Sequence, residues 1–178
     1  MQSTITDIRS HGTGRVRIRP LTAADRARLT EEFAHLSEQT KHRRFGTVAQ
    51  RLSERDLDRL TDIDHHDHEA FAAIAPGTDR IVGVARYIAL PEDPGAAEVA
   101  VEVDDDWQGH GLGRRLIDAL VTRARTEGIT RLLAYVSPDN LLVRGWIARA
   151  GGLAVTHDGD ATVYSIPLEQ RHTERRAA

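Results

Sequence analysis

The sequence predicts one α/β domain with a mixed, mostly antiparallel sheet, and three observations lead to this prediction. Short segments rich in valine and isoleucine alternate apolar with polar residues, which favours strands, and longer segments repeat apolar residues at helical spacing. The two kinds follow one another in the order β-α-α-β-β-β-α-β-α-β-β, which is typical of a mixed sheet covered by helices. With 178 residues, the chain is also long enough to form a core of its own.

The first part of the chain is expected to hold one strand and three stretches of helix. The strand is Val16–Pro20. Thr22 is a typical capping residue and predicts a helix over Ala23–Thr30, and the helical pattern resumes across Glu31–Arg44. Ser53 opens a further short helix, because Asp56 three residues later completes a capping pattern.

Three antiparallel strands are expected in the middle of the chain, joined by turns at Pro76-Gly77 and Pro91–Gly95. Their predicted ranges are Phe71–Ala75, Ile81–Leu90 and Ala97–Val103.

The last part of the chain is expected to continue as helix, strand, helix and hairpin. Apolar residues at helical spacing start a helix at about Gly113, and it stops at Thr126-Glu127-Gly128. Strand Ile129–Val136 follows, and a second helix begins near Asn140. The closing hairpin is predicted from strands Leu153–Thr156 and Thr162–Ile166 around an Asp-Gly-Asp turn.

Composition excludes several classes of protein. The absence of cysteine excludes disulfides, thiolate metal sites and a cysteine nucleophile. A net charge of −3 argues against a general nucleic-acid binder. No segment has the pattern of a signal peptide or a membrane span, so we expect a cytoplasmic protein that contacts neither membrane nor nucleic acid. Residues 1–14 and 169–178 are polar and expected to be disordered tails around a domain over 15–168.

The segment Gln108-Gly109-His110-Gly111-Leu112-Gly113 stands between a predicted strand and a predicted helix. Glycines at such a turn let backbone N–H groups converge on an anion, and the helix N-terminus adds its own donors. The loop lacks the Gly-Lys-Ser/Thr ending of a Walker A motif, and its glycine spacing matches a dinucleotide fingerprint poorly. The sequence therefore predicts a phosphate-binding turn of another kind.

Gln108, Gly111 and Gly113 fit the pattern Gln/Arg-x-x-Gly-x-Gly/Ala and resemble the pyrophosphate loop of the GNAT N-acetyltransferases, which bind acetyl-CoA. The resemblance covers roughly residues 15–166. Further segments resemble the catalytic domain of bacterial Pat-type protein lysine acetyltransferases, namely residues 36–45, 57–64, 81–87 and 106–109. Longer members carry an additional regulatory region, and we expect this chain to be the catalytic module alone.

The resemblance implies the GNAT fold, with helices on both faces of the sheet and a fourth strand that splays from the fifth. Acetyl-CoA would lie with its pyrophosphate on the loop and its pantetheine arm on the fourth strand, where backbone groups stay unpaired. The residues that the resemblance assigns to acetyl-CoA are Val101, Val103, Gln108, Gly109, His110, Gly111, Leu112, Gly113, Arg114, Arg115 and Asn140. A helix N-cap is the alternative role for Asn140.

The reaction needs a base, because an amine attacks only after its ammonium form loses a proton. Glu98 and Glu102 are the two candidates, and an undistorted strand points both side chains to one face. We favour Glu98, which lies ten residues before Gln108, close to the family's usual spacing. Ile147 occupies the position where the family often has a tyrosine general acid, so we assign no acid.

The acceptor is left open between two classes. We expect a lysine of a protein such as an acyl-CoA synthetase, and the alternatives are a small amine or a CoA-binding module without catalysis. A protein acceptor implies a shallow, acidic groove, and a small amine implies an enclosed pocket. The acidic, histidine-rich segment Asp62–Glu69 is contiguous, and we expect no metal site there but a loop near the acceptor entrance. A homodimer is the oligomer we consider.

Overall fold

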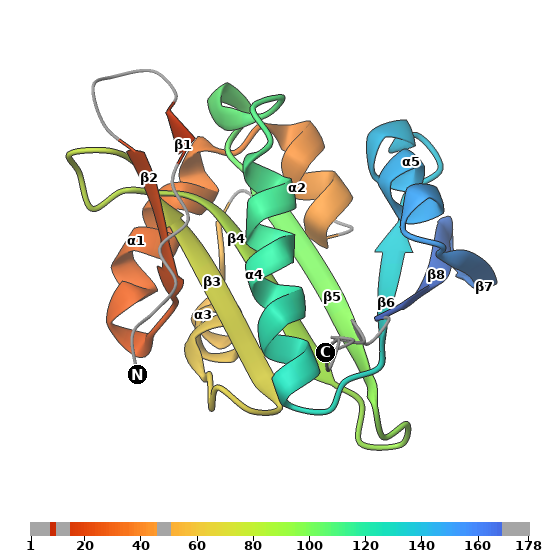
Figure 1. Cartoon of the computed structure of the whole chain (residues 1–178). Helices are drawn as coiled ribbons and strands as arrows, with labels where there is room; N and C mark the ends of the chain where they lie inside the picture. Colours follow the sequence, from red (N-terminus) through yellow and green to blue (C-terminus); the bar gives the residue numbers. More distant parts are fainter. Residues whose placement is uncertain (1–7, 10–14, 46–50, 169–178) are drawn as a thin grey trace, which may run out of the picture.

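The computed structural model describes residues 8–9, 15–45 and 51–168, and these form one sheet of eight strands (Figure 1). The strands are β1 (Ile8–Arg9), β2 (Arg15–Pro20), β3 (His68–Ile74), β4 (Ile81–Ala89), β5 (Ala96–Val103), β6 (Arg131–Val136), β7 (Leu153–Asp158) and β8 (Ala161–Pro167). They lie in the order β1-β2-β3-β4-β5-β6-β8-β7. Neighbours are antiparallel except β5 and β6, which are parallel. The predicted mixed, mostly antiparallel sheet is confirmed.

Helices cover both faces of this sheet, as Figure 1 shows. The helices are α1 (Arg26–His35), α2 (Glu38–Phe45), α3 (Glu54–Thr61), α4 (Leu112–Thr126) and α5 (Leu141–Arg149), with short 3-10 turns at Ala23–Asp25 and Asp105–Trp107. Leucines of α4 share a core with one face of β2–β5, and leucines of α1 and α3 share a second core with the opposite face. The fifth helix, α5, packs on β6 and β8 in a third, smaller cluster.

Strand β5 separates two environments by the alternation of its side chains. Its odd-numbered residues from Ala97 to Val103 belong to the apolar core with α4. The even-numbered Glu98, Ala100 and Glu102 point to the opposite face, where α1–α3 lie. A regular strand therefore gathers the apolar side chains on one side and the two carboxylates on the other, as the sequence pattern predicts.

The helical region before β3 breaks between α1 and α2, later than the predicted division into Ala23–Thr30 and Glu31–Arg44. The first three residues form a 3-10 turn, and the chain leaves α1 at Leu36, whose ψ of 139° is extended. The break has a cause distant in sequence: Asp105 accepts hydrogen bonds from the Ser37 N–H at 2.9 Å, the Ser37 hydroxyl at 3.0 Å and the Thr40 hydroxyl at 2.9 Å. The Ser37 hydroxyl accepts from the Thr40 N–H at 3.2 Å and caps α2, and the Asp105 carboxylate holds this cap in place, a contact that local periodicity cannot reveal.

Of the two predicted tails, the structure describes only Ile8–Arg9, which pairs with β2, and the other tail residues lie outside the described ranges. Within the described ranges, every helix is too short or too polar to cross a membrane.

We predict that Asp105→Ala lowers the free energy of unfolding by about 1–3 kcal/mol, because four hydrogen bonds to a charged acceptor are lost, two from Ser37 and one each from Thr40 and Gln108. Urea unfolding followed by circular dichroism measures this change. The matched control is Asp106→Ala, since that exposed side chain makes no hydrogen bond within the described residues. Equal stability of the two variants would contradict the capping role of Asp105.

Candidate functional site

The glycine loop has a backbone that only glycine adopts without strain. Gly109 and Gly111 have φ angles of 75° and 76°, in the left-handed region. A Cβ atom at either position would meet no atom within 4 Å, so the backbone conformation, and not lack of space, requires glycine. The loop therefore presents its backbone to an open surface.

The start of α4 leaves hydrogen-bond donors available at this loop. Gly111 is the N-cap residue and offers no side chain to the helix. Within residues 8–9, 15–45 and 51–168, the N–H groups of Leu112, Gly113 and Arg114 have no protein acceptor. These groups lie at the positive end of the helix dipole, so the geometry is that of an anion site.

Neighbouring elements hold the loop in place. The side-chain amide of Gln108 donates to the backbone oxygen of Val103 at 3.0 Å, which ties the loop to the end of β5. Gly113 packs against Trp146 of α5, and a Cβ atom there would come within 3.3 Å of the indole ring. The two predicted loop residues Gln108 and Gly113 thus orient the loop between β5 and α5.

Strands β5 and β6 separate soon after they meet. Their parallel pairing covers only residues 96–98 of β5 with residues 131–133 of β6, whereas β4 pairs with β5 over residues 97–103. Figure 1 shows the two strands diverging toward the end of the sheet that carries the glycine loop. The predicted splay of the fourth and fifth strands is confirmed at β5 and β6, which hold those places when the two-residue β1 is set aside.

Backbone groups of β5 are left unpaired where the strands diverge. The Leu90 N–H donates to Ala96 oxygen and the Asp104 N–H donates to Val82 oxygen, so the even-numbered residues of β5 turn their backbone toward β4. Val101 and Val103 consequently turn theirs toward β6, beyond its last paired residue. In the described chain, β6 supplies no partner to either residue. Both were expected to contact a cofactor arm, and that role stays a prediction.

The other residues predicted to bind the cofactor differ in their accessibility. Arg114 and His110 are exposed, while Arg115 is 8% exposed and its guanidinium nitrogens are buried. A bound phosphate can therefore reach Arg114 more directly than Arg115. The side-chain oxygen of Asn140 accepts from the Val143 N–H at 3.3 Å and caps α5, which leaves the amide NH₂ for a ligand.

The two candidate bases lie on one face of β5 but in different surroundings. Glu98 is exposed and lines a pocket of about 250 Å³ between α1–α3 and the sheet. The pocket is lined by Phe33, Arg44, Leu52, Asp56, Arg59, Leu60, Arg86, Ile88, Glu98 and Ala100. Glu102 is 6% exposed and accepts a hydrogen bond from Arg44 Nε at 2.6 Å. The structure thus leaves Glu98 accessible to an acceptor and holds Glu102 in an ion pair.

Buried charges lie beneath this pocket. Burial and the charges of Glu102 and Asp104 raise the pKa of Glu32, which is 3% exposed, far above its usual range. Arg86 donates from Nη1 to the Leu60 oxygen at 3.0 Å, and burial lowers the pKa of its guanidinium. These groups escaped the sequence analysis, although a glutamate on the apolar face of a helix and an arginine within an apolar strand are visible signals.

Helix α2 connects the two diverging strands through neighbouring arginines. Arg44 pairs with Glu102 of β5, and Arg43 Nη2 contacts Asp139, in the loop after β6, at 2.8 Å. In Figure 1, α2 lies at the end of the sheet where the strands separate. One short helix therefore touches both sides of the opening.

Neither a general acid at Ile147 nor a metal site in the acidic loop 62–69 was expected. The structure shows how the residues at these two positions are engaged. Ile147 is 4% exposed and packs against Ala134 and Val136. In the acidic loop, Asp64 accepts from the His66 and His68 N–H groups at 2.8 and 2.9 Å. The described residues include no group of three or more ligating side chains placed to hold a metal.

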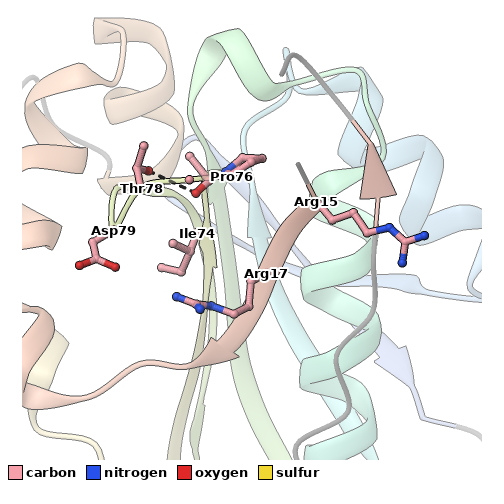
Figure 2. A pocket seen from close by; sticks show the side chains of 8 residues that line it. Arg15, Arg17, Ile74, Pro76, Thr78 and Asp79 are labelled. Atoms are coloured by element: carbon pink, nitrogen blue, oxygen red, sulfur yellow. Dashed lines mark hydrogen bonds between the residues drawn. The ribbon is translucent and has the colours of Figure 1, made fainter. Parts of the chain in front are cut away.

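A second hollow, of about 590 Å³, shares no lining residue with the pocket beside Glu98. It lies at the β3–β4 turn, where Figure 2 shows Arg17 extending toward Asp79 and Arg15 extending the other way. Because neither the glycine loop nor either candidate base lines it, we assign it no part in the site.

The sequence profile of the Acetyltransferase (GNAT) family matches residues 31–151. This chain belongs to that family and is an acyltransferase. The predicted resemblance to the Pat catalytic domain is confirmed.

Individual relatives agree with this assignment. The chain is 36% identical over 149 residues to an acetyltransferase of Pseudomonas aeruginosa, covering 83% of this chain and 80% of that protein. It is 30% identical over 141 residues to the acetyltransferase Pat of Mycolicibacterium smegmatis, covering 79% of this chain but only 42% of Pat. The GNAT domain of S. lividans PAT superposes with a TM-score of 0.78 at 28% identity, covering 86% of this chain and 91% of that domain.

We predict that Gly111→Trp weakens CoA binding at least about a hundredfold in a folded protein, because the indole would cover the free N–H groups of α4. Calorimetric titration with CoA measures the affinity. Gly77→Trp is the matched control, since Gly77 also has a left-handed φ of 70° and open space but lies at a distant turn. Intact CoA binding by Gly111→Trp would contradict the loop assignment.

We predict that Glu32→Gln stabilises the protein at pH 8 by roughly 1–3 kcal/mol and has a smaller effect at pH 5. The folded state keeps a proton that the unfolded chain releases above its ordinary pKa near 4.3, so Glu32 makes stability fall as pH rises. Urea unfolding at both pH values tests this, with Glu31→Gln as an exposed control on the same helix. Parallel pH profiles for wild type and Glu32→Gln would refute it.

Proposed function

We propose that this enzyme transfers an acetyl group from acetyl-CoA directly to the side-chain amine of a protein lysine. The observation that carries the proposal is the opening between β5 and β6, which has free N–H donors of α4 at one end and Glu98 near the other. The similarity to the acetyltransferase Pat supports acetyl transfer. The protein acceptor rests on the sequence resemblance to Pat-type protein lysine acetyltransferases.

The loop and β5 would hold acetyl-CoA along its length. The N–H groups at the start of α4 would bind the pyrophosphate, with Arg114 adding charge. The backbone of Val101 and the N–H of Val103, whose oxygen already accepts from the Gln108 amide, would bind the amides of the pantetheine arm and fix the thioester at the opening. A backbone N–H in this stretch would then donate to the thioester oxygen as it becomes negative.

Glu98 would act at the other reactant. Its carboxylate takes one proton from the acceptor ammonium, directly or through a water molecule, and the amine lone pair then attacks the thioester carbon. Collapse of the tetrahedral intermediate breaks the carbon–sulfur bond, and the second nitrogen proton passes to the leaving thiolate or to water as the neutral amide forms. The leaving thiolate needs no dedicated acid, because thiols have pKa values near 8–9.

A small amine is the second candidate acceptor, and the pocket is the observation that favours it. At about 250 Å³, the hollow beside Glu98 is confined, and three arginines line it against two carboxylates. A shallow acidic groove was expected for a protein lysine, so the pocket does not match that expectation.

A cytoplasmic location and a homodimer remain predictions.

The decisive experiment measures thiol release from acetyl-CoA with the purified enzyme, in parallel with an acyl-CoA synthetase and with a panel of small amines. Turnover with the synthetase supports the lysine proposal, and mass spectrometry then locates the acetylated residue. Turnover with small amines alone would replace it with the second candidate. Tight CoA binding without any turnover would point to a binding module.

We predict that Glu98→Gln lowers the acetylation rate at least about a hundredfold while acetyl-CoA affinity is preserved, because the amide cannot accept the ammonium proton. Steady-state rates and calorimetric titration measure the two effects. Glu102→Gln separates the candidates, since a larger rate loss in that variant than in Glu98→Gln would move the base to Glu102. Glu92→Gln, at the exposed turn before β5, is the neutral control.

A further inference from the structure

The arginines around Glu98 differ in how far contacts within the protein engage them. Three arginines line the pocket, from three different elements: Arg44 of α2, Arg59 of α3 and Arg86 of β4. Arg44 pairs with Glu102, and Arg86 is 3% exposed and donates to the Leu60 oxygen. Two of the three cations are therefore engaged in the wall of the pocket.

Arg59 differs from the other two. It is exposed, and within the described ranges it makes no hydrogen bond or ion pair. Two carboxylates precede it on α3: Asp58 pairs with Arg26, and Asp56, one turn earlier, accepts from the Ser53 hydroxyl at 2.6 Å and from the Ser53 N–H at 3.1 Å. Asp56 thus uses its hydrogen bonds for the capping box of α3 and reaches Arg59 only through charge attraction, so the Arg59 guanidinium keeps its hydrogen-bond donors for a ligand in the pocket.

The frame around Arg59 is fixed. Leu57 and Thr61 are buried on the inner side of α3, and the capping box sets where the helix begins. Arg26 of α1 also pairs with Glu54 at 2.6 Å and Asp58 at 2.8 Å, which holds α3 against α1. A guanidinium on such a helix occupies a defined part of the pocket wall and suits a planar carboxylate.

A pocket with a free cation is a poor site for an acceptor that carries only an ammonium group, because like charges repel. It suits an acceptor with a negative group close to its amine. On the basis of the proposed function, we propose that the pocket binds an acceptor carrying a carboxylate near its amine, with the amine at Glu98 and the carboxylate on Arg59. The carboxylate comes from an acidic residue beside an acceptor lysine or from the α-carboxylate of a small amino acid.

Matched acceptors test this proposal and separate the two sources. One set is three peptides with a single lysine flanked by glutamate, glutamine or lysine, and the other is L-leucine with L-leucinamide. In each set the amine is kept and the neighbouring charge is changed. The enzymes compared are wild type, Arg59→Gln, Arg59→Glu and Arg55→Gln, an exposed arginine one turn earlier on α3 that does not line the pocket.

We expect wild type to prefer the carboxylate-bearing acceptor of at least one set about tenfold or more in kcat/KM, with the difference in KM. The set that shows it identifies the source of the carboxylate. Arg59→Gln removes the preference, Arg59→Glu reverses it toward the lysine-flanked peptide, and Arg55→Gln keeps it. Absence of a charge preference in wild type, or its persistence in Arg59→Gln, overturns the proposal.

Binding of the same acceptors to the CoA complex is measured by calorimetry alongside turnover. A charge preference in binding that depends on Arg59, without any transfer, defeats the proposed function but supports the carboxylate site. Transfer with no dependence on Arg59 in either measurement does the reverse. The two proposals therefore fail separately.

Discussion

The site depends on a sheet that stops pairing partway along one strand. Strands β5 and β6 are joined over three residues and then separate, so the backbone of Val101 and Val103 lacks a strand partner. An unpaired buried backbone group costs roughly 1–3 kcal/mol, so such a gap persists only where other groups satisfy the backbone. The Gln108 side chain does so at the Val103 oxygen, and the remaining groups are left to water or a ligand. The glycine loop, α2 and α5 lie around this opening. Gln108 of the loop contacts the end of β5, α2 contacts Glu102 and Asp139, and Trp146 of α5 packs against Gly113.

Side chains alternate along β5, so one face of the strand is apolar and the other carries carboxylates. Valines on one face join the core beneath α4, while Glu98 and Glu102 on the other face meet arginines from α2 and β4. The charged groups beneath the pocket are buried away from water. Burial and the neighbouring carboxylates raise the pKa of Glu32, and removing any partner of these buried groups would be costly. The outer ones, Glu98 and Arg59, remain accessible. The buried charged groups thus serve the structure, whereas Glu98 on β5 and Arg59 on α3 are available to a substrate.

Much of this arrangement could be predicted from local patterns. The glycine spacing, the strand before it and the helix after it are contiguous, so Gln108 to Gly113 identified the loop and the family. The even spacing of Glu98 and Glu102 likewise predicted their common face. Their different surroundings were not predictable, because Arg44 lies 58 residues from Glu102 in sequence. The pocket arginines and the break before α2 also come from segments brought together only by folding. The divergence of β5 leaves no trace in its own sequence, since the valine alternation continues to Val103.

Consecutive residues on a helix point about 100° apart, which is why Arg43 and Arg44 reach different partners across the opening. One consequence is thermodynamic linkage. The same short helix borders the cofactor opening through Asp139 and the acceptor pocket through Arg44. If binding on one side shifts α2, the other side responds, and by reciprocity the coupling has the same size in both directions. Such coupling would need no movement of the sheet, because it would pass through the ion pairs of one eight-residue helix.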